Sequence, residues 1–119
     1  MRFKEPKNTR TIFWTKHVKE KMRFYNLSET RLKKLLKNPE RIERGIAPKT
    51  VAIMQKTKAK KRPTEIWLMY QKRKLKTQNS KLKTKKEVIV IISAWRYPGE
   101  SPIGQPPIPE ETLKILKNE

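Results

Sequence analysis

The sequence contains no cysteine and only one histidine in 119 residues. The absence of cysteine excludes disulfides, thiolate catalysis and Cys-ligated zinc, and one histidine is too few for a His-rich metal site. The three glycines form no glycine-rich loop that could cradle phosphates, and no pattern brings two carboxylates together for two-metal chemistry. We therefore expect neither a metal nor a cofactor.

Long apolar stretches are also missing. The longest uninterrupted run, residues 88–92, has five residues, whereas a membrane-spanning helix needs about 20. No apolar stretch follows the charged residues at the N-terminus, so they do not resemble a secretory signal. These absences predict a cytoplasmic protein with no membrane contact.

Acidic residues are scarce, because 11 Asp and Glu stand against 31 Lys and Arg, for a formal net charge of +20. Such a charge works against the compact state and favours any polyanion that neutralises it. About a third of the residues (34%) are hydrophobic, and the length suits one domain with one modest core. The composition therefore predicts a small folded protein whose partner is nucleic acid or an acidic protein.

Two short helices are expected near the N-terminus. Thr15 is a suitable N-cap for a helix over residues 16–25, in which apolar residues recur at helical spacing. Ser28 caps a second helix over residues 29–37, which ends before Pro39. Because so few residues separate them, we expect the two helices to lie side by side as a hairpin.

From residue 41 onward the pattern becomes that of strands. We expect a short edge strand over residues 41–45 and three further strands over residues 50–55, 65–71 and 87–95. The last of these contains a β-branched run without alternation, which is typical of a strand covered on both faces. We therefore place this strand at the centre of the sheet.

The expected fold is an α+β domain, in which the N-terminal helical hairpin packs on a three- to four-stranded antiparallel sheet with a long basic β-hairpin. Residues 1–97 form this domain. Residues 98–119 form a proline-rich tail, in which residues 110–117 are suited to a short last helix. We expect the tail to cover part of the sheet face opposite the helical hairpin.

The segment over residues 72–86 admits two interpretations. It is either a disordered basic loop or a continuation of the last two strands as one long hairpin that turns at residues 78–79. The register of that hairpin pairs Leu75 with Leu82 and Leu68 with Ile89. Alternation of lysine and leucine favours the hairpin, but the turn is not the preferred Asn-Gly, so this register is weakly specified.

Basic residues are concentrated in two segments without acids, residues 56–62 and 72–86, which together hold 13 of the 31. These segments connect to opposite ends of the strand expected over residues 65–71 and would form two basic poles that straddle an RNA backbone. Alternatively, lysine-rich turns simply keep a small protein soluble. At a charge of +20 we favour nucleic-acid contact. The expected RNA-binding residues are Lys21, Lys58, Lys60, Lys61, Arg62, Lys72, Arg73, Lys74, Lys76, Lys81, Lys83 and Trp95.

The two helices carry a recognisable motif, His17-Val18-x-x-Lys21-Met22-x-x-Tyr25-Asn26-Leu27-Ser28, followed by Asn38-Pro39-Glu40. The motif resembles the pattern His-Ala-x-x-Arg-Met-x-x-Arg-Gly-Ile-Ser. That pattern opens a poorly characterised prokaryotic family of the RelE/ParE-like toxins, within the barnase–EndoU–colicin–RelE group of ribonuclease folds. The resemblance covers residues 12–97 and implies an α-hairpin, an antiparallel sheet and an activity on RNA. Lys21 and Tyr25 stand where the family has arginine, so bidentate phosphate geometry and one cation are missing.

Cleavage of RNA without a metal needs a base, an acid and cations for the developing charge. His17 is the side chain whose ordinary pKa suits proton transfer near pH 7, and a position at a helix start would lower that pKa. Arg96 is a candidate to stabilise phosphate and Tyr97 to exchange a proton, while Trp95 could stack on a base. The resemblance makes such an Arg/Tyr site relevant, because RelE-like toxins tolerate it. The structural alternative is that His17 packs at the helix start and that Trp95 and Tyr97 belong to the core.

Three functions therefore stay open. The first is an endoribonuclease toxin that cuts mRNA, free or at the ribosome, and is held inactive by an acidic antitoxin. The second is a non-catalytic RNA-binding or ribosome-associated protein of the same fold. The third is a basic subunit that binds an acidic protein and never meets nucleic acid.

Overall fold

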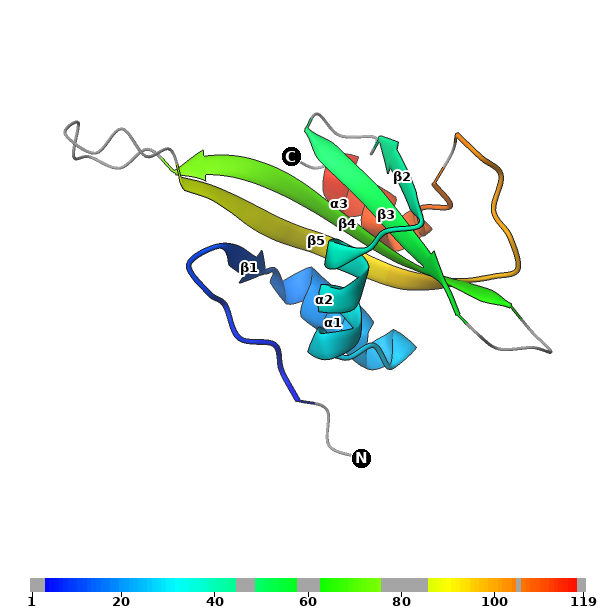
Figure 1. Cartoon of the computed structure of the whole chain (residues 1–119), viewed down its shortest axis with the longest axis horizontal. Coiled ribbons are helices and arrows are strands. Elements are labelled where there is room, and N and C mark those ends of the chain that lie inside the picture. The colour runs from blue at the N-terminus through cyan, green and yellow to red at the C-terminus, as the bar shows by residue number, and fades with distance from the viewer. Residues whose placement is uncertain (1–3, 45–48, 58–62, 76–85, 105, 118–119) are drawn as a thin grey trace.

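The computed structural model describes residues 4–44, 49–57, 63–75, 86–104 and 106–117 (Figure 1). Three helices and five strands follow one another along these residues. They are β1 (Ile12–Trp14), α1 (Lys16–Tyr25), α2 (Glu29–Lys37), β2 (Arg41–Arg44), β3 (Thr50–Lys56), β4 (Thr64–Leu75), β5 (Lys86–Pro98) and α3 (Glu110–Lys117).

The bounds predicted for the three helices are confirmed, and α1 and α2 each begin at a side-chain cap. The Thr15 hydroxyl accepts a hydrogen bond from the Val18 amide at 3.2 Å, and the Ser28 hydroxyl accepts one from the Arg31 amide at 3.1 Å. Helix α1 ends at Asn26, which adopts the left-handed conformation with φ of 56°. None of the helices in the described residues is long and apolar enough to cross a membrane.

The predicted antiparallel sheet of three to four strands is wrong, because the sheet has five strands and is mixed. Its order is β1-β5-β4-β3-β2, with β1 parallel to β5 and the other neighbours antiparallel. Strand β1, which has three residues and precedes the first helix, was not among the predicted elements. Such a short strand has no local signal, since its partner lies far along the chain. Strand β5 is an interior strand, as its pattern predicted, but the middle position belongs to β4.

The register predicted between the last two long strands is also wrong. Leu68 pairs with Ala94 rather than with Ile89, and Leu75 pairs with Lys86 rather than with Leu82. The ladder contains a bulge: Met69 pairs with Ser93 and Tyr70 with Ile91, so Ile92 is an extra residue on β5. The long hairpin is confirmed as far as the pair Leu75–Lys86, and its turn lies outside the described residues.

The outer edge of β1 is closed by the residues that precede it. The Asn8 side-chain oxygen accepts a hydrogen bond from the Trp14 amide at 2.8 Å. The Thr9 hydroxyl accepts one from the Ile12 amide at 3.0 Å, and the Thr9 amide donates to the Ile12 carbonyl at 2.9 Å. These bonds occupy groups that would otherwise be open to pairing with another strand.

The sheet is covered on both faces, with α1 and α2 in front of it and α3 behind it in Figure 1. The core between the sheet and the first two helices contains Trp14, Val18, Met22, Leu27, Leu32, Leu35, Ile53, Ile66, Leu68, Ile91 and Ala94. The core on the opposite face contains Ala52, Met54, Trp67, Met69, Trp95 and Leu116. Because Leu116 belongs to α3 and Ile108 packs beside it, the expectation that the tail covers this second face is confirmed.

Polar contacts also hold the tail on the second face. Arg41 of β2 donates hydrogen bonds to the carbonyl and the hydroxyl of Ser101, at 3.1 and 2.9 Å. The Glu43 carboxylate accepts a hydrogen bond from the Gly104 amide at 2.9 Å, and this bond, followed by one from Arg41, lowers the pKa of Glu43. The edge strand β2 therefore anchors the chain between β5 and α3.

Candidate nucleic-acid interface

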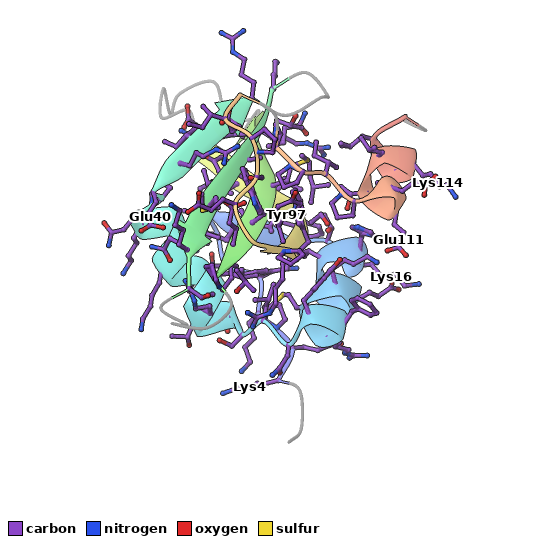
Figure 2. All side chains as sticks on the ribbon, turned by 90° about the vertical axis from the view of Figure 1, so that its right-hand side faces the viewer. Lys4, Lys16, Glu40, Tyr97, Glu111 and Lys114 are labelled. Atoms are coloured by element: carbon purple, nitrogen blue, oxygen red, sulfur yellow. The ribbon has the colours of Figure 1, made fainter. Side chains whose placement is uncertain are left out.

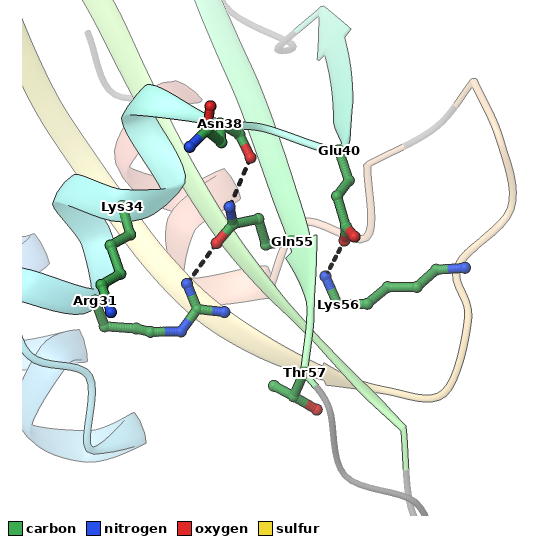
Figure 3. Close-up of a pocket in the computed structure, with 7 residues that line it drawn as sticks. All are labelled: Arg31, Lys34, Asn38, Glu40, Gln55, Lys56 and Thr57. Carbon is green, nitrogen blue, oxygen red and sulfur yellow. Dashed lines mark hydrogen bonds between the residues drawn. The ribbon is translucent and has the colours of Figure 1, made fainter.

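An open depression of about 590 Å³ lies between α2 and β3 (Figure 3). We call it the α2–β3 depression. Its lining is Arg31, Lys34, Asn38, Glu40, Gln55, Lys56 and Thr57. Three of these side chains are cationic and one is a carboxylate, so the depression is basic and otherwise lined by amides and a hydroxyl.

A short chain of hydrogen bonds holds Arg31 in this depression. One terminal nitrogen of its guanidinium donates to the Gln55 side-chain oxygen at 2.5 Å. The Gln55 side-chain nitrogen in turn donates to the backbone carbonyl of Asn38 at 2.6 Å. Figure 3 shows this chain running from α2 across the end of β3. The guanidinium is therefore oriented before any ligand arrives.

The two lysines are held less firmly. Lys34 is exposed on the same helix as Arg31. The ammonium of Lys56 extends towards the tail, where it lies 3.4 Å from the Glu100 carboxylate, and these side chains are 51% and 72% exposed. A pair so exposed contributes little and is easily exchanged for another anion. The Glu40 carboxylate accepts a hydrogen bond from the Lys56 backbone amide.

Arg96 adds positive charge behind Arg31. Burial first, and then the charge of Arg31, lower the pKa of Arg96. The group stays protonated at neutral pH, because the ordinary pKa of an arginine lies far above neutrality. Two guanidinium groups that influence one another in this way raise the local positive potential beside the depression.

The two basic segments expected from the sequence adjoin opposite ends of β4. Residues 56–62 precede the strand in the chain, and the segment over residues 72–86 begins within its last four residues. Strand β4 spans Thr64 to Leu75, which is about 36 Å at about 3.3 Å per residue. Lys72 and Arg73 are exposed near its far end, and Lys74 follows them in the strand. The remaining predicted residues, Lys58, Lys60, Lys61, Arg62, Lys76, Lys81 and Lys83, lie outside the described residues.

His17 lies at the interface between α1 and α3. Its Nε2 is 3.4 Å from the Thr112 hydroxyl, which is 2.9 Å from the hydroxyl of Ser93 on β5. Burial first, and then the charge of Lys21, lower the pKa of His17, against an opposing effect of Glu20. The direction is the expected one, but its cause is burial and a neighbouring lysine rather than the helix start.

Lys21 also belongs to this helix–helix interface. Its ammonium forms an ion pair with the Glu111 carboxylate of α3 and lies 5.4 Å from the centroid of the Phe24 ring. Glu111 is marked in Figure 2 beside α3. The cation predicted to bind RNA thus already has an anionic partner within the chain.

The structure does not bring the three predicted catalytic residues together. Arg96 donates to the backbone carbonyls of Tyr25 and Asn26, at 2.7 and 3.2 Å, and so caps the end of α1. Tyr97 packs against the core on the opposite face of β5. His17 is at the start of α1, roughly 12 Å from its end at 1.5 Å of rise per residue. No single phosphate could contact all three in this arrangement.

Trp95 is buried, with 1% of its surface exposed. Its ring stacks on that of Trp67, with 6.0 Å between the centroids and 6° between the planes. Since α3 and the tail cover this pair, Trp95 belongs to the core, as the structural alternative held, and presents no face to a base in the folded chain.

Arg31, Lys34 and Gln55 were not among the residues predicted to form the site. Arg31 and Lys34 are three residues apart on one helical face, which is a recognisable but common pattern. Gln55 and the Asn38 carbonyl join them only because β3 passes beside the end of α2. Among the described residues, no group of three or more histidine or acidic side chains could hold a metal ion.

Comparisons with protein-family models, with curated proteins and with solved structures give no match to this chain.

Proposed function

We propose that the protein binds RNA without cleaving it and that the α2–β3 depression is part of the binding surface. The observation that carries the proposal is the guanidinium of Arg31, oriented by Gln55, in a depression that two exposed lysines also line, in a chain of net charge +20. Phosphate groups are the ligands that such a cluster favours. Lys72 and Arg73 are further exposed cations near the far end of β4. The proposal includes a cytoplasmic location, where RNA is accessible.

The positions of the predicted catalytic groups favour binding over cleavage. His17 faces α3, Arg96 caps α1 and Tyr97 packs in the second core. A metal-independent nuclease needs its base, acid and phosphate-binding cation around one phosphate. The resemblance to RelE/ParE-like toxins implies RNA cleavage instead. Cleavage is therefore the alternative that the experiment below must distinguish from binding.

Fluorescence anisotropy with a labelled single-stranded RNA tests the proposal. We expect the logarithm of the affinity to fall linearly with the logarithm of the salt concentration between about 50 and 200 mM. The double variant Arg31→Ala/Lys34→Ala should reduce that slope by about one to one and a half, because each lost phosphate contact on a single strand removes about 0.7.

The matched control is Lys16→Ala/Lys114→Ala. It also removes two positive charges, from α1 and α3, and Figure 2 shows both lysines far from Glu40, which lines the depression. Equal effects of the two double variants, or an affinity that does not change with salt, would reject the proposed site. If RNA fragments appeared with the wild type and not with His17→Ala, the function would be RNA cleavage and not binding without cleavage.

A further inference from the structure

We infer that the α2–β3 depression binds a terminal phosphate of the RNA, a phosphomonoester, in preference to an internal phosphodiester. This inference rests on the RNA binding proposed above and specifies which part of the RNA the depression contacts. A 5′ end and a 3′ end can present the same group, and the experiment distinguishes the two.

The charge of the depression matches a dianion. Arg31, Lys34 and Lys56 supply three positive charges and Glu40 supplies one negative charge, which leaves a formal charge of +2. A phosphomonoester carries about −1.5 to −2 at pH 7, whereas each internal phosphate of a nucleic acid carries a single negative charge. An internal phosphate would therefore leave one positive charge of the depression unmatched.

The available donors suit the extra oxygen of a terminal phosphate. Within the described residues Arg31 uses one terminal nitrogen for Gln55, so the other terminal nitrogen and Nε are free to act as a bidentate fork. Lys34 lines the depression from the same helix and Lys56 lines it from β3. A phosphomonoester has three terminal oxygens to accept these donors, whereas a phosphodiester has two.

Lys56 must leave the tail to take part. Its contact with Glu100 spans 3.4 Å between largely exposed groups, and a dianion is a stronger partner than a single carboxylate. The long lysine side chain can therefore turn from Glu100 to the ligand. Binding of a terminal phosphate consequently competes with one contact that anchors the tail.

Gln55 acts as a positioning residue, because its side-chain oxygen accepts the hydrogen bond that orients Arg31. It is itself fixed through the Asn38 carbonyl. Gln55→Met keeps every charge of the depression but releases the guanidinium. We expect this variant to lose most of the preference for a phosphorylated end while its affinity for unphosphorylated RNA stays within about twofold, since the electrostatic attraction is unchanged.

The preference should depend on pH through the ligand. The second pKa of a phosphate monoester is near 6, so the group loses about one negative charge when the pH falls from about 7.5 to 5. The charged groups that face the ligand are Arg31, Lys34, Lys56 and Glu40, with Arg96 and Glu100 beside them. The advantage of a phosphorylated end should therefore shrink on acidification.

Anisotropy with RNA oligomers of one sequence and about 12 nucleotides tests the inference, since a strand of this length fills a typical single-strand site. One pair carries a 5′-phosphate or a 5′-hydroxyl, and a second pair a 3′-phosphate or a 3′-hydroxyl. At pH 7.5 we expect at least one phosphorylated end to bind about tenfold tighter than its hydroxyl partner, and at pH 5 less than about threefold tighter.

Arg31→Ala should bring the ratio of the two affinities close to one, and Arg31→Lys should leave an intermediate ratio, because it keeps the charge and loses the fork. Lys16→Ala/Lys114→Ala should leave the ratio unchanged. Circular dichroism checks that each variant is folded. Inorganic phosphate should compete with the phosphorylated oligomer for the depression.

Equal affinities for phosphorylated and hydroxyl ends would overturn the inference and leave RNA binding standing, whereas loss of binding to every oligomer would reject both. If inorganic phosphate bound in an Arg31-dependent way while neither RNA end showed a preference, the ligand would be free phosphate, and the assignment to an RNA end would be wrong.

Discussion

The guanidinium of Arg41 on β2 lies 3.7 Å from the carboxylate of Glu65 on β4, and that carboxylate is only 1% exposed. Glu65 also accepts hydrogen bonds from the Trp67 indole at 3.1 Å and from the Ser101 hydroxyl at 2.5 Å. The Arg41 guanidinium carbon is in addition 5.0 Å from the centroid of the Trp67 ring. A buried carboxylate with one cationic neighbour and several neutral donors thus joins the sheet to the tail.

Replacing Arg41 by methionine should therefore destabilise the protein strongly. The change leaves Glu65 buried without a counter-charge, and we expect a loss of about 2–4 kcal/mol in the free energy of unfolding, measured with denaturant. Glu65→Gln in the same background should restore part of the loss, because an amide is less costly to bury than a carboxylate. The control Arg44→Met, an exposed position in the same strand, should change stability by less than about 0.5 kcal/mol. Similar losses at Arg41 and Arg44 would contradict the role given to Arg41.

The buried hydroxyls of Ser93 and Thr112 give a second prediction. Their oxygens are 2.9 Å apart and both residues are fully buried. Thr112→Val keeps the shape but removes one partner, so we expect a loss of about 1–3 kcal/mol. Adding Ser93→Ala should cost less than the sum of the two single changes, because the orphaned hydroxyl is then removed. The control is Thr30→Val in the first turn of α2, which is exposed and should be nearly neutral. Additive losses would show that the two hydroxyls do not interact.

His17 gives a prediction for pH, and because it is the only histidine its NMR titration is unambiguous. Burial and Lys21 lower its pKa from the ordinary 6.5, so the folded state binds the proton less readily than the unfolded state. The contribution of His17 to stability is therefore fully present above pH 6.5 and is lost as the pH falls through and below this value. The stability of the wild type relative to His17→Gln should fall over this window, and Lys21→Met should raise the His17 pKa. A His17 pKa at or above 6.5 would contradict the described interface between α1 and α3.

Arg96 is predicted to matter for folding rather than for RNA. Its two hydrogen bonds join β5 to the carbonyls that end α1. Arg96→Gln should lower the free energy of unfolding by about 1–2 kcal/mol, a value reduced for partial exposure, while RNA affinity falls less than about threefold. Arg31→Ala should do the reverse and weaken RNA binding with little loss of stability. A collapse of RNA affinity in folded Arg96→Gln would assign Arg96 to the binding surface.

Local signals explain which parts of the fold the sequence predicts. The caps at Thr15 and Ser28 fix the helix starts through hydrogen bonds within three residues, so the bounds of α1 and α2 agree with the prediction. Strand β1 has no such signal, because its three residues are stabilised by a partner late in the chain. The register of β4 and β5 depends on a turn without a preferred dipeptide and on the extra residue Ile92 in the ladder.

The candidate site was harder to predict than the fold. Counting lysines identified segments rich in charge, but charge alone does not show which cation is oriented. Arg31 becomes distinctive only through Gln55, which is 24 positions away in the chain. Trp95 illustrates the opposite error, since an aromatic beside an arginine fits a base-stacking pattern and a core pattern equally well. Only the position of α3 over the second face decides between them.

The pairing of β1 with β5 also determines when the sheet can be completed during synthesis. Ile12 pairs with Ile89, which is 77 positions later. At a synthesis rate of about 5–20 residues per second, the first strand is therefore made about 4–15 s before its partner. The bonds from Asn8 and Thr9, by contrast, span only three to six positions and need no later residue. They can form as soon as this stretch leaves the ribosome. The nascent chain would then present its earliest apolar strand with one side already occupied, which limits its chance of pairing with a neighbouring unfinished chain.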